Sequence, residues 1–165
     1  MFLKKILPLI LLLLIFSSCQ DNNTVSLDYS VGSEQDNGFS FNKMAVLSND
    51  VNQNINADFI VLPQMSDSGK LLAPFLVQTE LKSSFLLSKQ FDNLMAAEQY
   101  YNNYTSFSDN GSVFDYNAIP VKPFQVWIVI TNANLYGKIL ISEASAAYVN
   151  NSPNAVVNFK AELLK

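Results

Sequence analysis

The chain has 165 residues, of which 49% are hydrophobic and 15% are charged, and its formal net charge at pH 7 is −4. It contains no histidine and no arginine. It therefore lacks the commonest general base, the usual catalytic triads and the ligands of most zinc sites, so we expect it not to be an enzyme. An acidic chain without concentrated basic residues is also not expected to bind nucleic acid.

The N-terminal segment combines two basic side chains, Lys4 and Lys5, with an apolar run over residues 6–16. A membrane-spanning helix needs about 20 apolar residues, whereas this run has 11 and contains Pro8. The order of basic, apolar and then small residues is typical of a secretion signal. We therefore expect residues 1–18 to be a signal peptide rather than a permanent transmembrane segment.

The only cysteine, Cys19, directly follows this apolar run and two serines. The sequence Phe-Ser-Ser-Cys over residues 16–19 resembles a bacterial lipobox, in which the cysteine is acylated through its sulfur and becomes the first residue of the mature protein. The alternative is an ordinary secretory peptide with a chance cysteine. Lipidation at Cys19 predicts attachment to the outer membrane, either on its periplasmic face or at the cell surface.

The rest of the chain has the size of one domain. We expect residues 19–36 to form the lipidated N-terminus, a tether and a first strand, and residues 37–165 to form a β domain. Because Cys19 is the only thiol, no disulfide can form within the chain, and burial of apolar side chains must stabilise the fold.

Several strands are predicted in the first half of the domain. Apolar and polar residues alternate over 24–31 and, with mixed spacing, over 38–47. A short apolar run that ends at Pro63 predicts a buried strand, whereas Pro74 inside the next run predicts an edge or bent strand. The acidic residues form no recognisable pair by spacing, so we expect nearly all of them, Asp58 included, to be solvated at the surface.

One helix is predicted from about Ser84 to Tyr101. Between residues 82 and 104 the apolar positions recur at steps near three and four, as they do on one face of a helix. Neighbouring alanines favour a helix, and a serine at position 83 or 84 could cap its N-terminus.

The C-terminal part predicts three further strands. Two β-rich runs over residues 124–131 and 135–142 are separated by Asn132-Ala133-Asn134, which predicts a hairpin. The last run, over residues 154–163, alternates after Pro153. The expected fold class is therefore mainly β, with antiparallel sheets or hairpins and one α-helix in a single domain.

Residues 114–163 resemble the closing block of the HmuY-like family of haem-binding bacterial lipoproteins. In that block an aromatic-x-Tyr pair, here Phe114 and Tyr116, precedes a proline-bearing segment. A strand ending in a threonine follows, here at Thr131, and Lys138 starts the next strand seven residues later. This order of features carries the resemblance.

The opening part of the domain carries a second resemblance to the same family. Residues 39–41 form a Phe-x-Phe strand, and Asp58-Phe59-Ile60 stands where the family has a Trp-Asp-Ile-like core, with Ala57 in place of the tryptophan. Together with the lipobox, these parts span most of residues 19–165. The chain is thus similar to a divergent member of the family that lacks all histidines.

The resemblance implies haem as a possible cofactor. Founding members hold the haem iron between side chains, typically two histidines, and a methionine thioether or a tyrosine can also ligate haem iron. The ligand-binding candidates in this chain are therefore Met65, Met95, Tyr104 and Tyr116, with Trp127 in the wall of the cleft. We expect Met65 to be the most exposed methionine, and core packing is the favoured interpretation of Met95.

Two functional hypotheses follow. In the first, a hydrophobic cleft walled by Phe107, Phe114, Tyr116 and Trp127 takes up haem or another flat apolar molecule and passes it to an outer-membrane transporter. In the second, a structural or adhesive surface lipoprotein has kept the fold and lost haem ligation. Convergence of Met65, Met95 or a tyrosine on one open pocket would favour the first hypothesis.

Overall fold

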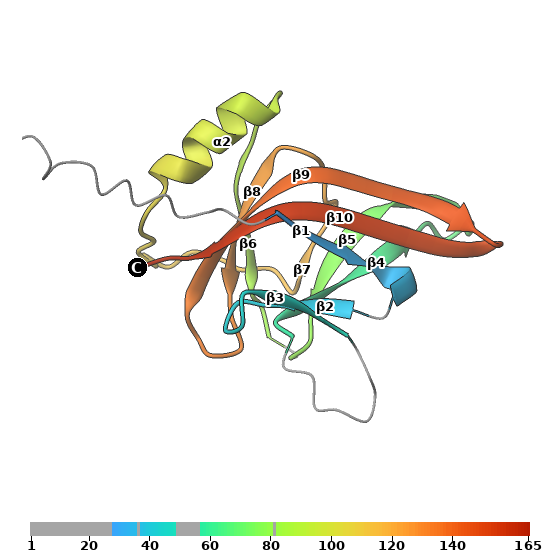
Figure 1. The fold of residues 1–165 in the computed structure, drawn as a ribbon, viewed down its shortest axis with the longest axis horizontal. Coiled ribbons are helices and arrows are strands. Elements are labelled where there is room, and N and C mark those ends of the chain that lie inside the picture. The colour runs from blue at the N-terminus through green and yellow to red at the C-terminus, as the bar shows by residue number, and fades with distance from the viewer. Residues whose placement is uncertain (1–27, 36, 49–56, 81) are drawn as a thin grey trace, which may run out of the picture.

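The computed structural model describes residues 28–35, 37–48, 57–80 and 82–165, which form two five-stranded antiparallel sheets and one α-helix (Figure 1). The first sheet has the order β1-β10-β9-β8-β6, with bounds Asp28–Gly32, Ser152–Leu163, Tyr136–Val149, Gln125–Ile130 and Phe85–Gln90. The second sheet has the order β3-β2-β4-β5-β7, with bounds Ala45–Ser48, Asn37–Ser40, Phe59–Met65, Leu71–Gln78 and Asn117–Ala118. A short 3-10 helix, η1 (Ser33–Gln35), follows β1. The predicted fold class is confirmed.

Phenylalanine side chains form the centre of the core between the two sheets. The ring of Phe159 lies 5.1 Å from that of Phe39 and 5.4 Å from that of Phe59, measured between centroids. All three side chains are completely buried. Each contributes about 1.5–3 kcal/mol relative to an exposed side chain, so the core can stabilise the domain without a disulfide.

Two prolines lie opposite each other in the second sheet, Pro63 in β4 and Pro74 in β5. The prediction that Pro63 ends its strand is wrong, because β4 continues to Met65. The carbonyl of Pro74 points away from β4 and accepts a hydrogen bond from the Val121 N–H at 3.2 Å. Since the proline nitrogens likewise face away from the partner strand, neither residue removes a donor from the β4–β5 ladder.

The helix α2 (Leu94–Asn103) begins later than predicted, because residues 85–90 form β6. Its N-cap is Asn93, whose Oδ1 accepts a hydrogen bond from the Ala96 N–H at 2.9 Å. The predicted cap, Ser84, instead donates its hydroxyl hydrogen to Gln78 Oε1 at 2.6 Å. Pairing of Phe85 with Val129 of β8 therefore decides the structure of this segment, in spite of its helix-like spacing.

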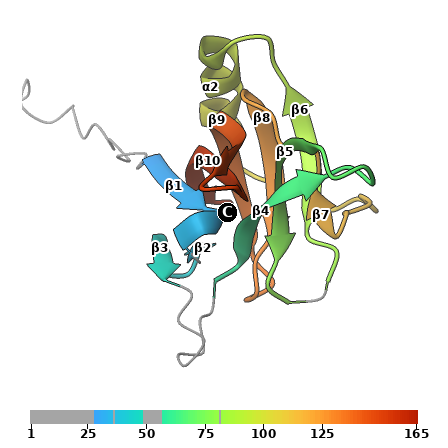
Figure 2. The same cartoon turned by 90° about the vertical axis from the view of Figure 1, so that its right-hand side faces the viewer.

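The outer face of the first sheet supports α2, which lies on the opposite side of this sheet from β2 and β3 (Figures 1 and 2). Ala97 and Tyr101, one turn apart on the helix, are buried against Val126 of β8 and Leu140 of β9. This contact fixes the C-terminal end of α2 over β9.

Strand β9 is longer than predicted and forms a hairpin with β10. The expected strand over residues 135–142 extends to Val149, and the turn that follows has Asn150 and Asn151 at φ angles of 50° and 65°. Two residues with positive φ form the tight turn that matches the twist of paired strands, and asparagine tolerates this conformation. The pairing with β10 outweighs the low strand preference of the serines and alanines in residues 142–147.

Candidate functional site

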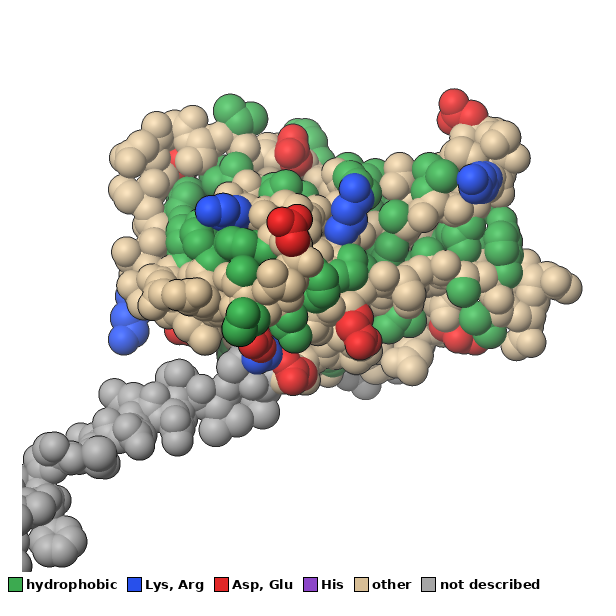
Figure 3. Space-filling model, turned by 90° about the horizontal axis from the view of Figure 1, so that it is seen from above, with side chains coloured by type: hydrophobic (Ala, Val, Ile, Leu, Met, Phe, Trp, Pro, Cys, Tyr) green, Lys and Arg blue, Asp and Glu red, His purple; other side chains and the backbone are tan. Residues whose placement is uncertain are grey.

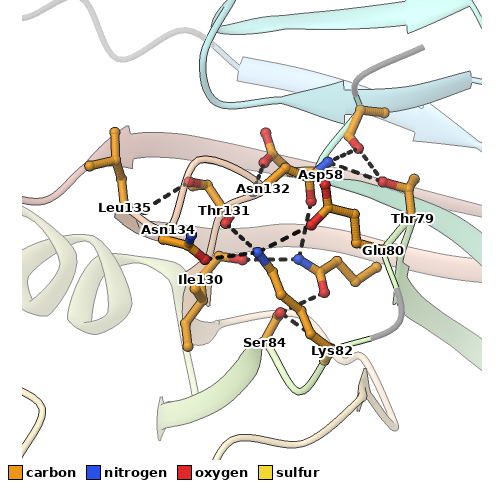
Figure 4. Close-up of polar contacts among 12 residues, drawn as sticks. Asp58, Thr79, Glu80, Lys82, Ser84, Ile130, Thr131, Asn132, Asn134 and Leu135 are labelled. Atoms are coloured by element: carbon orange, nitrogen blue, oxygen red, sulfur yellow. Dashed lines mark hydrogen bonds and ion pairs between the residues drawn. The ribbon is translucent and has the colours of Figure 1, made fainter. Parts of the chain in front are cut away.

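A cleft of about 270 Å³ lies at the end of the sandwich, where the start of β4, the β8–β9 loop and the end of β10 meet (Figure 4). Its lining residues come from both sheets and include Phe41, Asp58, Glu80, Asn132, Leu135 and Leu163. Three of these side chains are apolar, two are carboxylates and one is an amide. The lining of the cleft therefore combines apolar and polar side chains, as small-ligand sites commonly do.

Asp58 is the buried carboxylate of this cleft, with only 3% of its surface exposed. Its Oδ2 accepts a hydrogen bond from the Phe41 N–H and its Oδ1 one from the Asn132 N–H, both at 2.6 Å. The expectation that Asp58 is solvated is wrong, because these two donors lie on loops that cover it. Its position inside an apolar run, directly before Phe59, was the signal that it is buried.

Amide and hydroxyl side chains hold the β8–β9 loop in place around Asp58. Gln78 Nε2 donates to the Ile130 carbonyl and to Asn132 Oδ1, each at 3.2 Å, and Asn132 Nδ2 donates to the Ala57 carbonyl at 2.9 Å. The hydroxyl of Thr79 donates to the same Ala57 carbonyl. The loop is thus tied to both sheets, which gives the cleft a fixed shape.

Lys82 lies beside the cleft and interacts with the same loop. Its Nζ donates to the Thr131 carbonyl at 2.9 Å and to Asn134 Oδ1 at 3.2 Å, and it forms an ion pair with Glu80 at 3.4 Å. The side chain of Glu80 is 55% exposed, so this ion pair contributes at most about 1 kcal/mol. In the described part of the chain, Asp58 forms no ion pair with any lysine.

A buried lysine, Lys138, connects α2 to the first sheet away from the cleft. Its Nζ donates to the Tyr101 carbonyl at 2.7 Å and the Tyr104 carbonyl at 2.8 Å, and it lies 3.1 Å from Glu162 Oε2. A positive charge at the C-terminal end of a helix is favourable because the helix carbonyls point toward it. Lys138, which carries part of the family resemblance, therefore holds the C-terminal end of α2 against the first sheet.

Met65 and Tyr116, two of the candidate haem ligands, lie near opposite ends of β5. Met65 is opposite Leu71, whereas Asn117, next to Tyr116, is opposite Val77. Six residues of strand span about 20 Å, so these two side chains do not approach one iron atom. Tyr116 is 63% exposed and Met65 is 38% exposed.

The other three candidates also lie apart. Met95 is on the solvent side of α2 and is 78% exposed, so the expectations that it packs in the core and that Met65 is the most exposed methionine are both wrong. Trp127 is buried, and its Nε1 donates to Gln125 Oε1 at 3.0 Å. Tyr104 packs on Tyr100 with ring centroids 5.5 Å apart, and burial raises the pKa of its hydroxyl, which opposes ligation as a phenolate.

The expected cleft walls at Phe107 and Phe114 belong to an aromatic cluster with Tyr136 of β9. The ring centroid of Phe107 is 4.8 Å from that of Tyr136 and 6.0 Å from that of Phe114. Tyr116 and Trp127 have no ring contact with this cluster within the described residues. The cluster packs a loop onto β9 instead of lining the cleft described above.

The described residues contain no group of three or more His, Cys, Asp or Glu side chains placed to hold a metal ion. Among the helices described, none has the length and hydropathy needed to cross a membrane. On the face that carries α2, lysines and acidic residues are dispersed among hydrophobic and neutral side chains, without a gathering of positive charge (Figure 3).

Comparison of the chain with family models, with curated proteins and with solved structures finds no match. Cys19, the predicted signal peptide and the tether lie outside the described residues. The HmuY-like resemblance and the lipidation of Cys19 therefore stay predictions from the sequence.

Proposed function

We propose that this chain is a lipid-anchored, extracytoplasmic protein that binds a partner or ligand without catalysing a reaction, and that it does not hold haem iron. This is the structural or adhesive alternative of the two hypotheses. The anchoring rests on the order of basic, apolar and small residues before Cys19.

The observation that carries the proposal is the separation of the candidate iron ligands. Met65 and Tyr116 lie about 20 Å apart along β5, Met95 points to solvent, and the indole nitrogen of Trp127 is hydrogen-bonded inside the core. Ligation of haem iron by two side chains, which the resemblance implies for founding members of the family, needs side chains that meet at one iron atom. A β-sandwich with a rigid polar cleft supports recognition of a different kind of ligand.

Titration of the full chain in detergent micelles with haem, under oxidising and under reducing conditions, tests the proposal that the chain does not hold haem iron. We expect the Soret band to show haem dispersed in micelles, with no saturation near one haem per chain. Met65→Ala and Tyr116→Phe variants should give the same titration as the parent chain. Saturation at one haem per chain that either variant abolishes would contradict the proposal and favour haem capture.

Metabolic labelling with a fatty acid tests the anchor. The parent chain should incorporate the label and sediment with membranes, whereas Cys19→Ser should lose both properties because the acylated sulfur is gone. Ser18→Ala, which keeps a small residue before the cysteine, is the matched control and should be labelled like the parent. Equal labelling of the parent and Cys19→Ser would show that Cys19 is not the acylated residue.

A further inference from the structure

The cleft at the end of the sandwich has an unbalanced negative charge. Asp58 and Glu80 contribute two carboxylates to its lining, and Lys82 is the one ammonium group that interacts with residues of this cleft in the described chain. Lys82 is already held by the Thr131 carbonyl, Asn134 and Glu80. Asp58 therefore has no cationic partner among the described residues.

The acceptor capacity of Asp58 is only partly used. An ionised carboxylate offers about four lone-pair positions, and the described structure gives Asp58 two hydrogen bonds, from the Phe41 and Asn132 N–H groups. Both donors are backbone groups, so they fix the carboxylate while leaving its net charge in place. A buried carboxylate is normally paired, and Asp58 is one of the residues that line the cleft.

Part of the cleft lining is apolar. Phe41, Leu135 and Leu163 line it together with the carboxylates, and Leu135 is 51% exposed. A lining with both apolar side chains and two carboxylates fits a ligand that has a positive end and a short hydrocarbon stem, because the stem can be removed from water while the charge meets Asp58 and Glu80. A neutral or anionic ligand would leave the charge of Asp58 unmatched.

We infer that this cleft binds an alkylammonium group, supplied either by a free amine or by a lysine side chain of a partner protein. The ammonium lies between Asp58 and Glu80, and its hydrocarbon stem lies against Leu135 and Leu163. This inference goes beyond the proposed function, since it names a ligand chemistry and holds whether or not Cys19 carries lipid.

NMR titration of the isotope-labelled full chain in detergent micelles with n-butylammonium chloride tests the inference. The amide signals of Phe41 and Asn132 report on the cleft, since both N–H groups bind Asp58. We expect these signals to shift and saturate with n-butylammonium, whereas 1-butanol, which has the same stem and no charge, should produce no saturable shift. Absence of saturation with n-butylammonium, or an equal response to 1-butanol, would overturn the inference.

Two charge-neutralising variants sharpen the test. Glu80→Gln is at an exposed position and should fold normally, and loss of one of the two carboxylates should raise the dissociation constant of n-butylammonium about fivefold. Asp67→Asn removes one negative charge in the exposed β4–β5 turn and should leave the dissociation constant unchanged. Equal affinity of the parent and Glu80→Gln would overturn the placement of the ammonium between the two carboxylates.

The source of the ammonium is distinguished by a second ligand, a lysine residue blocked at both backbone ends. Binding of blocked lysine at least as tight as that of n-butylammonium supports a partner protein as the source. Binding of n-butylammonium alone supports a free amine, because the peptide groups then do not fit at the mouth of the cleft. Blocked lysine acetylated on Nζ is the control and should not bind in either case.

Discussion

Lys138→Met removes the charge that holds the C-terminal end of α2 and keeps a side chain of similar length. Lys138 is 1% exposed and donates to the carbonyls of Tyr101 and Tyr104, which lose these hydrogen bonds in the variant. The Tyr101 carbonyl keeps a hydrogen bond from the Tyr104 N–H at 3.2 Å, so it loses one bond to a charged group, worth about 1.5–3 kcal/mol. The Tyr104 carbonyl loses its lysine donor, and an acceptor left without a donor costs about 1–3 kcal/mol when it is buried. The side chain of Glu162 is 50% exposed and can turn to water, so the lost ion pair adds little. We expect the free energy of unfolding to fall by about 2–4 kcal/mol.

Urea unfolding, followed by the fluorescence of the single tryptophan, Trp127, measures this change. Lys160→Met is the matched control, since Lys160 also joins β10 to α2 through a 2.7 Å ion pair with Glu98, but at a partly exposed site. It should lower the free energy of unfolding by no more than about 1 kcal/mol. If the free energy of unfolding falls by the same amount in the two variants, the assignment of Lys138 as the residue that fixes α2 is refuted.

Three further predictions concern buried polar groups. Asp58→Asn replaces one acceptor oxygen by an amide group that faces a backbone N–H. We expect urea unfolding to show that the free energy of unfolding falls by about 2–3 kcal/mol. A fall below about 0.5 kcal/mol would contradict the two hydrogen bonds of Asp58. Tyr101→Phe should raise the free energy of unfolding by about 1 kcal/mol, because the buried hydroxyl of Tyr101 has no hydrogen-bond partner among the described residues; a loss of stability would mean that it has one. Burial, with a smaller contribution from Glu162, raises the pKa of Tyr101, so the folded state retains this proton when the unfolded state loses it. Below pH 10 this group therefore makes the free energy of unfolding no more dependent on pH, and above pH 10 that free energy falls as the pH rises. Tyr101→Phe should remove this part of the pH dependence, and an unchanged pH profile would contradict it.

The strands with strong local signals were predicted correctly from the sequence, and the segment at β6 was not. The runs around Trp127 and over residues 154–163 are rich in residues that favour strands, and asparagines mark the turn between β8 and β9. In contrast, β6 is an edge strand whose structure depends on pairing with β8, far along the chain. Its adjacent Phe85 and Leu86 point to opposite faces, which produces spacing like that of a helix.

The candidate site could not be predicted because its contacts are long-range. Asp58 binds backbone groups 17 and 74 residues away in the sequence, and no spacing rule connects them. Met95 was predicted to pack in the core and is exposed instead. It has the spacing of a core residue on a helix, yet the buried face of α2 is formed by Ala97 and Tyr101. The buried face of a short helix depends on the angle at which the helix crosses the sheet. No local pattern in the sequence specifies this crossing angle.

Pro63 and Pro74, which face each other in the second sheet, affect whether strands of neighbouring copies of this protein can pair. Under the proposed lipid anchoring, copies of this protein would meet in one membrane plane at high local concentration, and an unpaired strand of one copy can pair with the same strand of a neighbouring copy. Along β5, Leu76 and Val77 are paired with β7, and the Pro74 carbonyl is already bonded to the Val121 N–H. Pro74 also offers no donor to a further strand. A neighbouring strand would therefore find neither a free donor nor a free acceptor at Pro74, while the ladder inside the sandwich stays intact.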